Sequence, residues 1–133
     1  MDAATRDLAR QRASSRCEYC HFPAHALDLP FHVEHIVATV HRPDNRETNL
    51  AWACPRCNLR KGPNLSTINI DTGELVELFN PRTMQWSDHF ELQAGVIVGK
   101  TACGEGTARL LDMNHPQRLQ HRRQLIEQGE FQE

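Results

Sequence analysis

The stretch Ala53-Cys54-Pro55-Arg56-Cys57-Asn58-Leu59-Arg60-Lys61-Gly62 decides how this chain is organised, because it joins a C-x-x-C pair to a polar and basic run. A second pair lies upstream, in Cys17-Glu18-Tyr19-Cys20. Each pair bends the backbone into a tight knuckle with two thiolates, and two knuckles complete a tetrahedral Zn²⁺ site. We therefore predict a closed, structural zinc site made of Cys17, Cys20, Cys54 and Cys57. His21 or His25 could replace one cysteine, although nothing in the spacing favours either.

Composition indicates a single globular domain spanning residues 1–133, since 39% of the residues are hydrophobic and 24% are charged. Aromatic residues make up only 6%, so we expect the metal site to hold part of the structure together. No apolar run of about 18 residues occurs, and residues 1–7 lack an apolar signal core, which predicts a cytoplasmic protein without a membrane partner. The fifth cysteine, Cys103, is interpreted as a buried small hydrophobe.

Charge is distributed unevenly along the chain. The formal net charge of −2 argues against a general polyanion binder. Residues 41–61 nevertheless carry five basic residues against two acidic ones, a local balance of +3. This basic patch could face a phosphate, and the alternative is an ordinary solvated face.

The first half of the chain predicts a helix, two strands and a second helix. Alanines and an absence of helix breakers favour a helix over 2–13. Residues 31–37 alternate in character and are rich in β-branched and aromatic side chains, which favours a strand, with a return strand over 49–53. Pro55 at a first helical position opens a helix that runs to Lys61 and stops at Gly62.

The second half, residues 67–133, reads as an appended β-hairpin and helical extension. Turn residues over 71–73 predict the hairpin, and apolar stripes predict the helices. The expected elements are a hairpin of 67–70 and 74–79, strands over 86–92 and 95–99, and helices over 105–113 and 116–128.

Several residues between the two cysteine pairs could carry out chemistry. Glu34-His35 lies at a strand end, Asn49 opens the return strand, and Asn58 lies on the helix. A neutral imidazole can take a proton from water near pH 7. A carboxylate and an amide oxygen can hold a hard divalent cation that offsets charge on a phosphate. The set therefore favours metal-assisted phosphodiester hydrolysis.

The order and spacing of these residues resemble the HNH endonuclease family over residues 17–62. The resemblance is carried by the two C-x-x-C pairs and by Val33-Glu34-His35-Ile36, Asn49-Leu50-Ala51 and Asn58-x-x-Lys61-Gly62. It implies an α+β fold whose core, over 14–66, is the ββα-metal motif, also called the His-Me finger. The downstream layer is similar to small stand-alone bacterial HNH proteins.

The resemblance also implies a role for each residue. His35 is the expected general base, Asn49 orients the loop, and Asn58 occupies the third motif position, where many relatives have histidine. Glu34 stands where the family often has aspartate, and it would bind the catalytic Mg²⁺, Mn²⁺ or Ni²⁺ together with Asn58. Basic side chains on the helix flank could hold DNA phosphates without reading sequence; these are Arg56, Arg60 and Lys61. The last helix could extend that footprint through Arg118, Arg122 and Arg123, and the equally weighted alternative is an ordinary solvated helix face.

These residues favour a metal-dependent endonuclease that hydrolyses DNA, with no obligate protein partner evident. The alternatives are a non-catalytic, zinc-stabilised module that binds nucleic acid or protein, and an enzyme acting on another phosphodiester. The nuclease hypothesis depends on one geometric condition. Glu34 and His35 point to opposite faces of a regular strand, so both can serve one site only if the strand ends at this pair.

Overall fold

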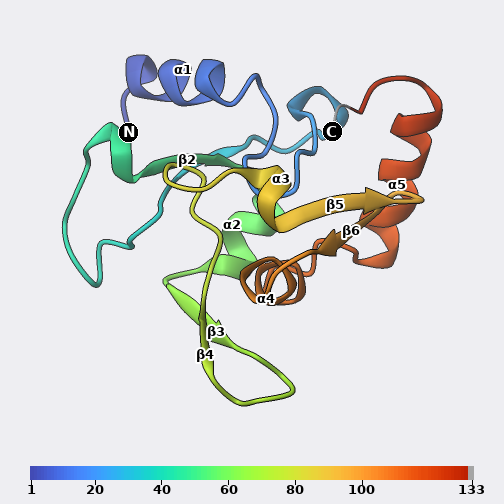
Figure 1. Ribbon diagram of the computed structural model, residues 1–133. Helices are drawn as coiled ribbons and strands as arrows, with labels where there is room; N and C mark the ends of the chain where they lie inside the picture. Colours follow the sequence, from blue (N-terminus) through green and yellow to red (C-terminus); the bar gives the residue numbers. More distant parts are fainter. Residues whose placement is uncertain (132–133) are drawn as a thin grey trace.

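The computed structural model describes residues 1–131, and its helices and strands surround a small core in an α+β arrangement (Figure 1). The α-helices are α1 (Ala3–Arg12), α2 (Pro55–Lys61), α3 (Trp86–His89), α4 (Ala102–Leu110) and α5 (Pro116–Glu127). The strands are β1 (His32–His35), β2 (Leu50–Ala53), β3 (Ser66–Ile68), β4 (Leu75–Glu77), β5 (Phe90–Gln93) and β6 (Val96–Gly99). They pair in sequence order into three separate antiparallel two-stranded sheets.

The unit that positions the candidate site is β1, β2 and α2. The two strands pair from His32 opposite Ala53 to His35 opposite Leu50, and α2 packs against both. Helix α2 begins where expected, because Cys54 caps it and Pro55 occupies its first turn. It ends at Gly62, whose φ of 51° is one that glycine adopts readily. Strand β1 is shorter than the predicted 31–37 and ends at His35, so the geometric condition for the Glu34-His35 pair is met.

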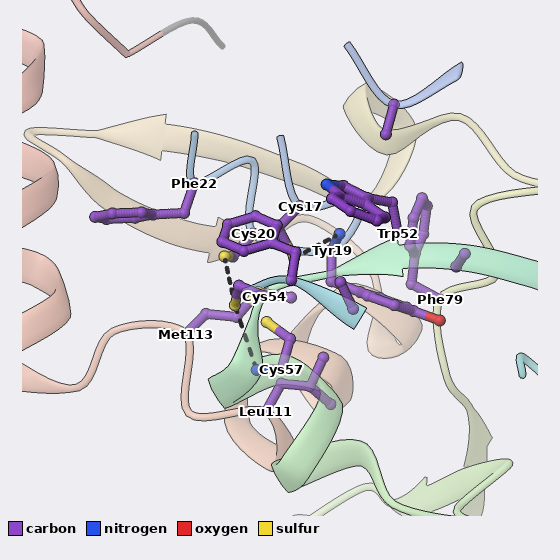
Figure 2. Close-up of a cluster of buried hydrophobic side chains, with 14 of the residues drawn as sticks. Cys17, Tyr19, Cys20, Phe22, Trp52, Cys54, Cys57, Phe79, Leu111 and Met113 are labelled. Atoms are coloured by element: carbon purple, nitrogen blue, oxygen red, sulfur yellow. Dashed lines mark hydrogen bonds between the residues drawn. The ribbon is translucent and has the colours of Figure 1, made fainter. Parts of the chain in front are cut away.

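The core gathers around the cysteines, as Figure 2 shows. Tyr19 and Phe22 come from the first knuckle, Trp52 comes from β2, and Leu111 and Met113 follow α4. All five are at most 4% exposed. Burying aromatic and aliphatic side chains from both halves of the chain therefore packs residues 67–131 onto the cysteine-bearing half.

The segment 86–92 differs from its prediction, because Trp86–His89 forms the short helix α3 and only Phe90–Gln93 is a strand. Trp86 donates its indole N–H to the Tyr19 carbonyl at 2.8 Å and stacks on His21 with ring centres 4.1 Å apart. These contacts with the first knuckle override the β-propensity of the segment.

Helix α4 also differs, since it begins at Ala102 rather than near residue 105. The Thr101 hydroxyl caps it by accepting the Gly104 N–H at 3.0 Å. Helix α4 packs tightly on β6 and on the end of α3: a Cβ added at Gly104 would lie 2.0 Å from the His89 carbonyl oxygen. At Gly106 the nearest atom to an added Cβ is the Thr67 methyl, at 2.8 Å.

We expect Gly104→Ala to lower the free energy of unfolding by about 3 kcal/mol, because backbone must move to admit the methyl group. The matched change Gly106→Ala should cost less than about 1 kcal/mol, since a side chain can rotate away and alanine favours the helix. Urea unfolding followed by circular dichroism measures both. Equal stability of the two variants would contradict this account of the packing.

Candidate active site and metal centre

The four predicted cysteines converge. The sulfur atoms of Cys17, Cys20, Cys54 and Cys57 all lie within 4.8 Å of one another, and all four residues are buried (Figure 2). Backbone N–H groups point at the sulfurs: the Tyr19 N–H donates to Cys17 Sγ at 3.4 Å. Four buried sulfurs in two knuckles form a donor set that could hold a metal such as zinc, and they leave no open position for substrate.

The two histidines considered as replacement ligands lie outside this cluster. His21 stacks on Trp86, and burial lowers the pKa of its imidazole to about 3. His25 reaches Glu130, with Nε2 3.7 Å from the carboxylate. Within residues 1–131, the sulfur cluster is therefore made by the cysteines alone.

Burial makes it unfavourable for the sulfurs of the cluster to carry negative charge. It raises the pKa of the Cys17 thiol well above its usual value, because a thiolate there has lost its water. Arg118, on α5, partly offsets this cost: its Nη1 lies 3.3 Å from Cys54 Sγ and 3.6 Å from Cys20 Sγ. The same guanidinium lies over the Phe22 ring, 4.4 Å from its centre. Arg118 thus supplies a positive charge that favours the ionised sulfurs.

The expectation that α5 extends a DNA footprint therefore needs correction for Arg118 and Arg122, whereas Arg123 is exposed. Arg118 faces the sulfurs. Arg122 is fully buried and donates to the carbonyls of Gly95 and Met113. The Arg123 Nε donates to the Ala94 carbonyl at 2.9 Å. Arg118 and Arg122 therefore hold α5 against the rest of the molecule and do not present charge to a phosphate.

Three of the residues predicted to carry chemistry line one open cavity of about 440 Å³. Glu34 and His35 contribute from the end of β1 and Asn58 from α2, beside Thr39 and the 80% exposed Leu59. The Asn58 side chain makes no hydrogen bond to any residue in the described part of the chain, so its amide is available to an incoming group. The cavity thus brings an imidazole and an amide to one solvent-open place.

His35 has a defined orientation. Its Nε2 lies 2.8 Å from the side-chain oxygen of Asn45. An amide oxygen only accepts hydrogen bonds, so this contact places the proton on Nε2 and leaves a lone pair on Nδ1. Asn45 thereby selects the form of the imidazole that can accept a proton, and no local sequence pattern marks it for this role.

Asn49 ties together the loop that follows β1. Its side-chain amide donates to the carbonyls of Val37 and Asp44, at 3.0 and 2.9 Å, and its oxygen accepts the Val37 N–H at 2.8 Å. Asn49 is 5% exposed, so these bonds replace water. Asn49 does not line the cavity, and its contacts are those expected of a residue that orients the loop.

Glu34 and Lys61 form a buried pair. The Lys61 Nζ lies 3.3 Å from Glu34 Oε2 and donates to the Ile36 carbonyl at 2.9 Å. The other Glu34 oxygen accepts the Tyr19 hydroxyl. Burial raises the pKa of Glu34, while Lys61 and Tyr19 act in the opposite direction. Lys61 is only 2% exposed, so the expectation that it holds a phosphate from an exposed helix flank needs correction.

The other two basic residues of α2 lie partly at the surface. Arg56 pairs with the Asp112 carboxylate. Arg60 is exposed, and its Nε donates to the Leu110 carbonyl at 3.3 Å. Both side chains therefore link α2 to the end of α4, and of the three predicted phosphate ligands Arg60 is the most accessible.

An antiparallel strand pair followed by a helix, with a Cys₄ cluster at one end and a histidine–asparagine cavity at the other, defines a ββα-metal class of protein. Comparison with known families agrees: residues 17–64 match the family model of the HNH endonuclease. That segment is thus similar to an HNH endonuclease domain. No curated protein and no solved structure matches the chain. No helix in the described residues is long and apolar enough to cross a membrane.

Replacing a cluster cysteine should remove the bound metal and the cooperative fold with it. We expect Cys57→Ser, or chelation of the wild-type protein, to abolish a sharp thermal transition, because a structural zinc site contributes roughly 10 kcal/mol to a small domain. Metal analysis and near-ultraviolet circular dichroism measure both effects. Cys103→Ser is the control, since Cys103 lies outside the sulfur cluster and its thiol is 4.0 Å from the Met84 sulfur. A chelated protein that melts like the untreated one would refute the metal's role.

Proposed function

We propose that this chain is a metal-dependent endonuclease that hydrolyses phosphodiester bonds in DNA, with structural zinc on its four cysteines. The observation that carries the proposal is the open cavity in which an oriented His35 and an unpaired Asn58 amide meet. The HNH match over residues 17–64 supports the reaction class. The choice of DNA rests on that family resemblance and on Arg60, an exposed cation on α2.

The chemistry proposed for the cavity begins with His35. Its Nδ1 takes a proton from a water molecule, whose oxygen attacks the phosphorus while the bond to the 3′ oxygen breaks. The 3′ oxygen leaves with the bonding electron pair and takes a proton from solvent water, so the products are a 5′-phosphate and a 3′-hydroxyl end. Asn58 would hold a divalent cation such as Mg²⁺, Mn²⁺ or Ni²⁺, which when bound supplies charge stabilisation at the phosphate. Asn45 holds the Nε2 proton in place throughout.

A non-catalytic, zinc-stabilised nucleic-acid-binding module remains the second candidate. It gains support from Glu34, because both oxygens of this predicted metal ligand are engaged inside the protein. Salt-dependent DNA binding without cleavage would favour this candidate over the nuclease.

His35→Ala should lower the rate of plasmid cleavage by about 10²- to 10⁴-fold, the usual contribution of a general base. The assay compares purified proteins on supercoiled plasmid in Mg²⁺, Mn²⁺ or Ni²⁺, with metal-free controls. His32→Ala is a matched control, because His32 lies on the same strand, is exposed and does not line the cavity. Equal cleavage by wild type and His35→Ala would refute His35 as the base.

Asn45→Ala should lower the cleavage rate by roughly 10- to 100-fold, because the imidazole loses the partner that fixes its protonated nitrogen. Asn45→Asp keeps an oxygen acceptor for Nε2 and should restore most of the activity. Single-turnover cleavage of a labelled duplex measures the chemical step directly. If Asn45→Ala cleaved at the wild-type rate, the proposed orientation of His35 would be wrong.

A further inference from the structure

Tyr19, Glu34 and Lys61 form a buried polar cluster next to the candidate active site. Glu34 Oε1 accepts the Tyr19 hydroxyl, and Oε2 lies 3.3 Å from the Lys61 ammonium. Tyr19, Glu34 and Lys61 are 1%, 6% and 2% exposed, respectively. Water therefore does not compete for these contacts, and the carboxylate meets both of its partners inside the protein.

The cluster joins the three parts of the fold on which the site depends. Tyr19 lies in the first knuckle, between Cys17 and Cys20, and Lys61 is the last residue of α2. Lys61 contacts the chain on both sides of the histidine, through the Glu34 carboxylate before it and the Ile36 carbonyl after it. The backbone at His35 is thus held from the knuckle and from the helix at once.

We propose that Glu34 is a positioning residue, which fixes His35 through Tyr19 and Lys61, and that it does not bind the catalytic cation. This inference rests on the proposed nuclease function. If Glu34 turned toward a cation in the cavity, it would leave Lys61 buried without an anion. Breaking one side of a buried ion pair is strongly unfavourable, because the remaining charge has neither water nor a partner.

The cation would then depend on few protein ligands. Asn58 supplies one oxygen, and water and the oxygens of the DNA phosphate supply the others, as is common for Mg²⁺ sites that act on phosphates. Binding of Mn²⁺ should accordingly be weak in the free protein and stronger when DNA is present.

The test measures Mn²⁺ affinity and cleavage separately on the full chain. Electron paramagnetic resonance reports free Mn²⁺ during titration of the protein mixed with an uncleavable phosphorothioate duplex. The principal variant is Glu34→Gln combined with Lys61→Met, because removing both charges leaves no unpaired ion in the core. Tyr19→Phe is a milder variant that removes a single hydrogen bond, and Asn58→Ala serves as the ligand control.

We expect the double variant and Tyr19→Phe to bind Mn²⁺ as wild type does, while kcat falls and KM stays unchanged. Asn58→Ala should weaken Mn²⁺ binding by at least about tenfold. Glu34→Asp discriminates further: a metal ligand tolerates this change, whereas a positioning carboxylate becomes too short to reach both partners, so kcat should fall.

The possible failures are distinguishable. A wild-type protein that cleaves DNA, together with a double variant and a Tyr19→Phe variant of reduced Mn²⁺ affinity, would overturn the positioning role and leave the nuclease function standing. Full activity of Glu34→Asp would also overturn it. A wild-type protein that neither binds Mn²⁺ nor cleaves DNA would overturn the nuclease function and this inference together.

Discussion

Four sulfur atoms buried within 4.8 Å of one another set the main constraint on this molecule. Thiolates at that spacing repel one another in a medium of low polarity, so the arrangement requires a cation or protons on the sulfurs. The first knuckle, the β2–α2 junction and Arg118 of α5 all meet at this point. A metal there would hold together three segments that are far apart in the sequence.

The candidate active site is separate from that cluster and is connected to it through buried side chains. Tyr19 extends from the first knuckle to Glu34, and Lys61 closes the connection from α2. His35 and Asn58 line a cavity of about 440 Å³ that is open to solvent, and the buried cluster lies on the protein side of that cavity. The sulfur cluster and the candidate active site are therefore separate, and the buried cluster of Tyr19, Glu34 and Lys61 links them.

Local patterns predicted much of this from the sequence. The C-x-x-C spacing, Pro55 and Gly62 indicate the knuckles and the limits of α2 because each acts within a few residues. Whether each charged side chain is buried or exposed could not be predicted in the same way. Lys61 and Arg122 look like surface cations, yet each is buried and donates to a carbonyl 25 or more residues away, that of Ile36 and that of Gly95. Likewise, Trp86–His89 becomes helical through contact with Tyr19 and His21, which no local pattern reveals.

The most direct test of the account is anomalous X-ray scattering from crystals of the protein soaked in Mn²⁺ with a short uncleavable DNA. Zinc and manganese give different anomalous signals, so the peaks of the two metals can be told apart. The account predicts zinc among the four cysteine sulfurs and manganese in the cavity beside Asn58 and the bound phosphate, with Glu34 still paired to Lys61. Manganese bound elsewhere, or an empty cavity in a DNA complex, would contradict the proposed nuclease site.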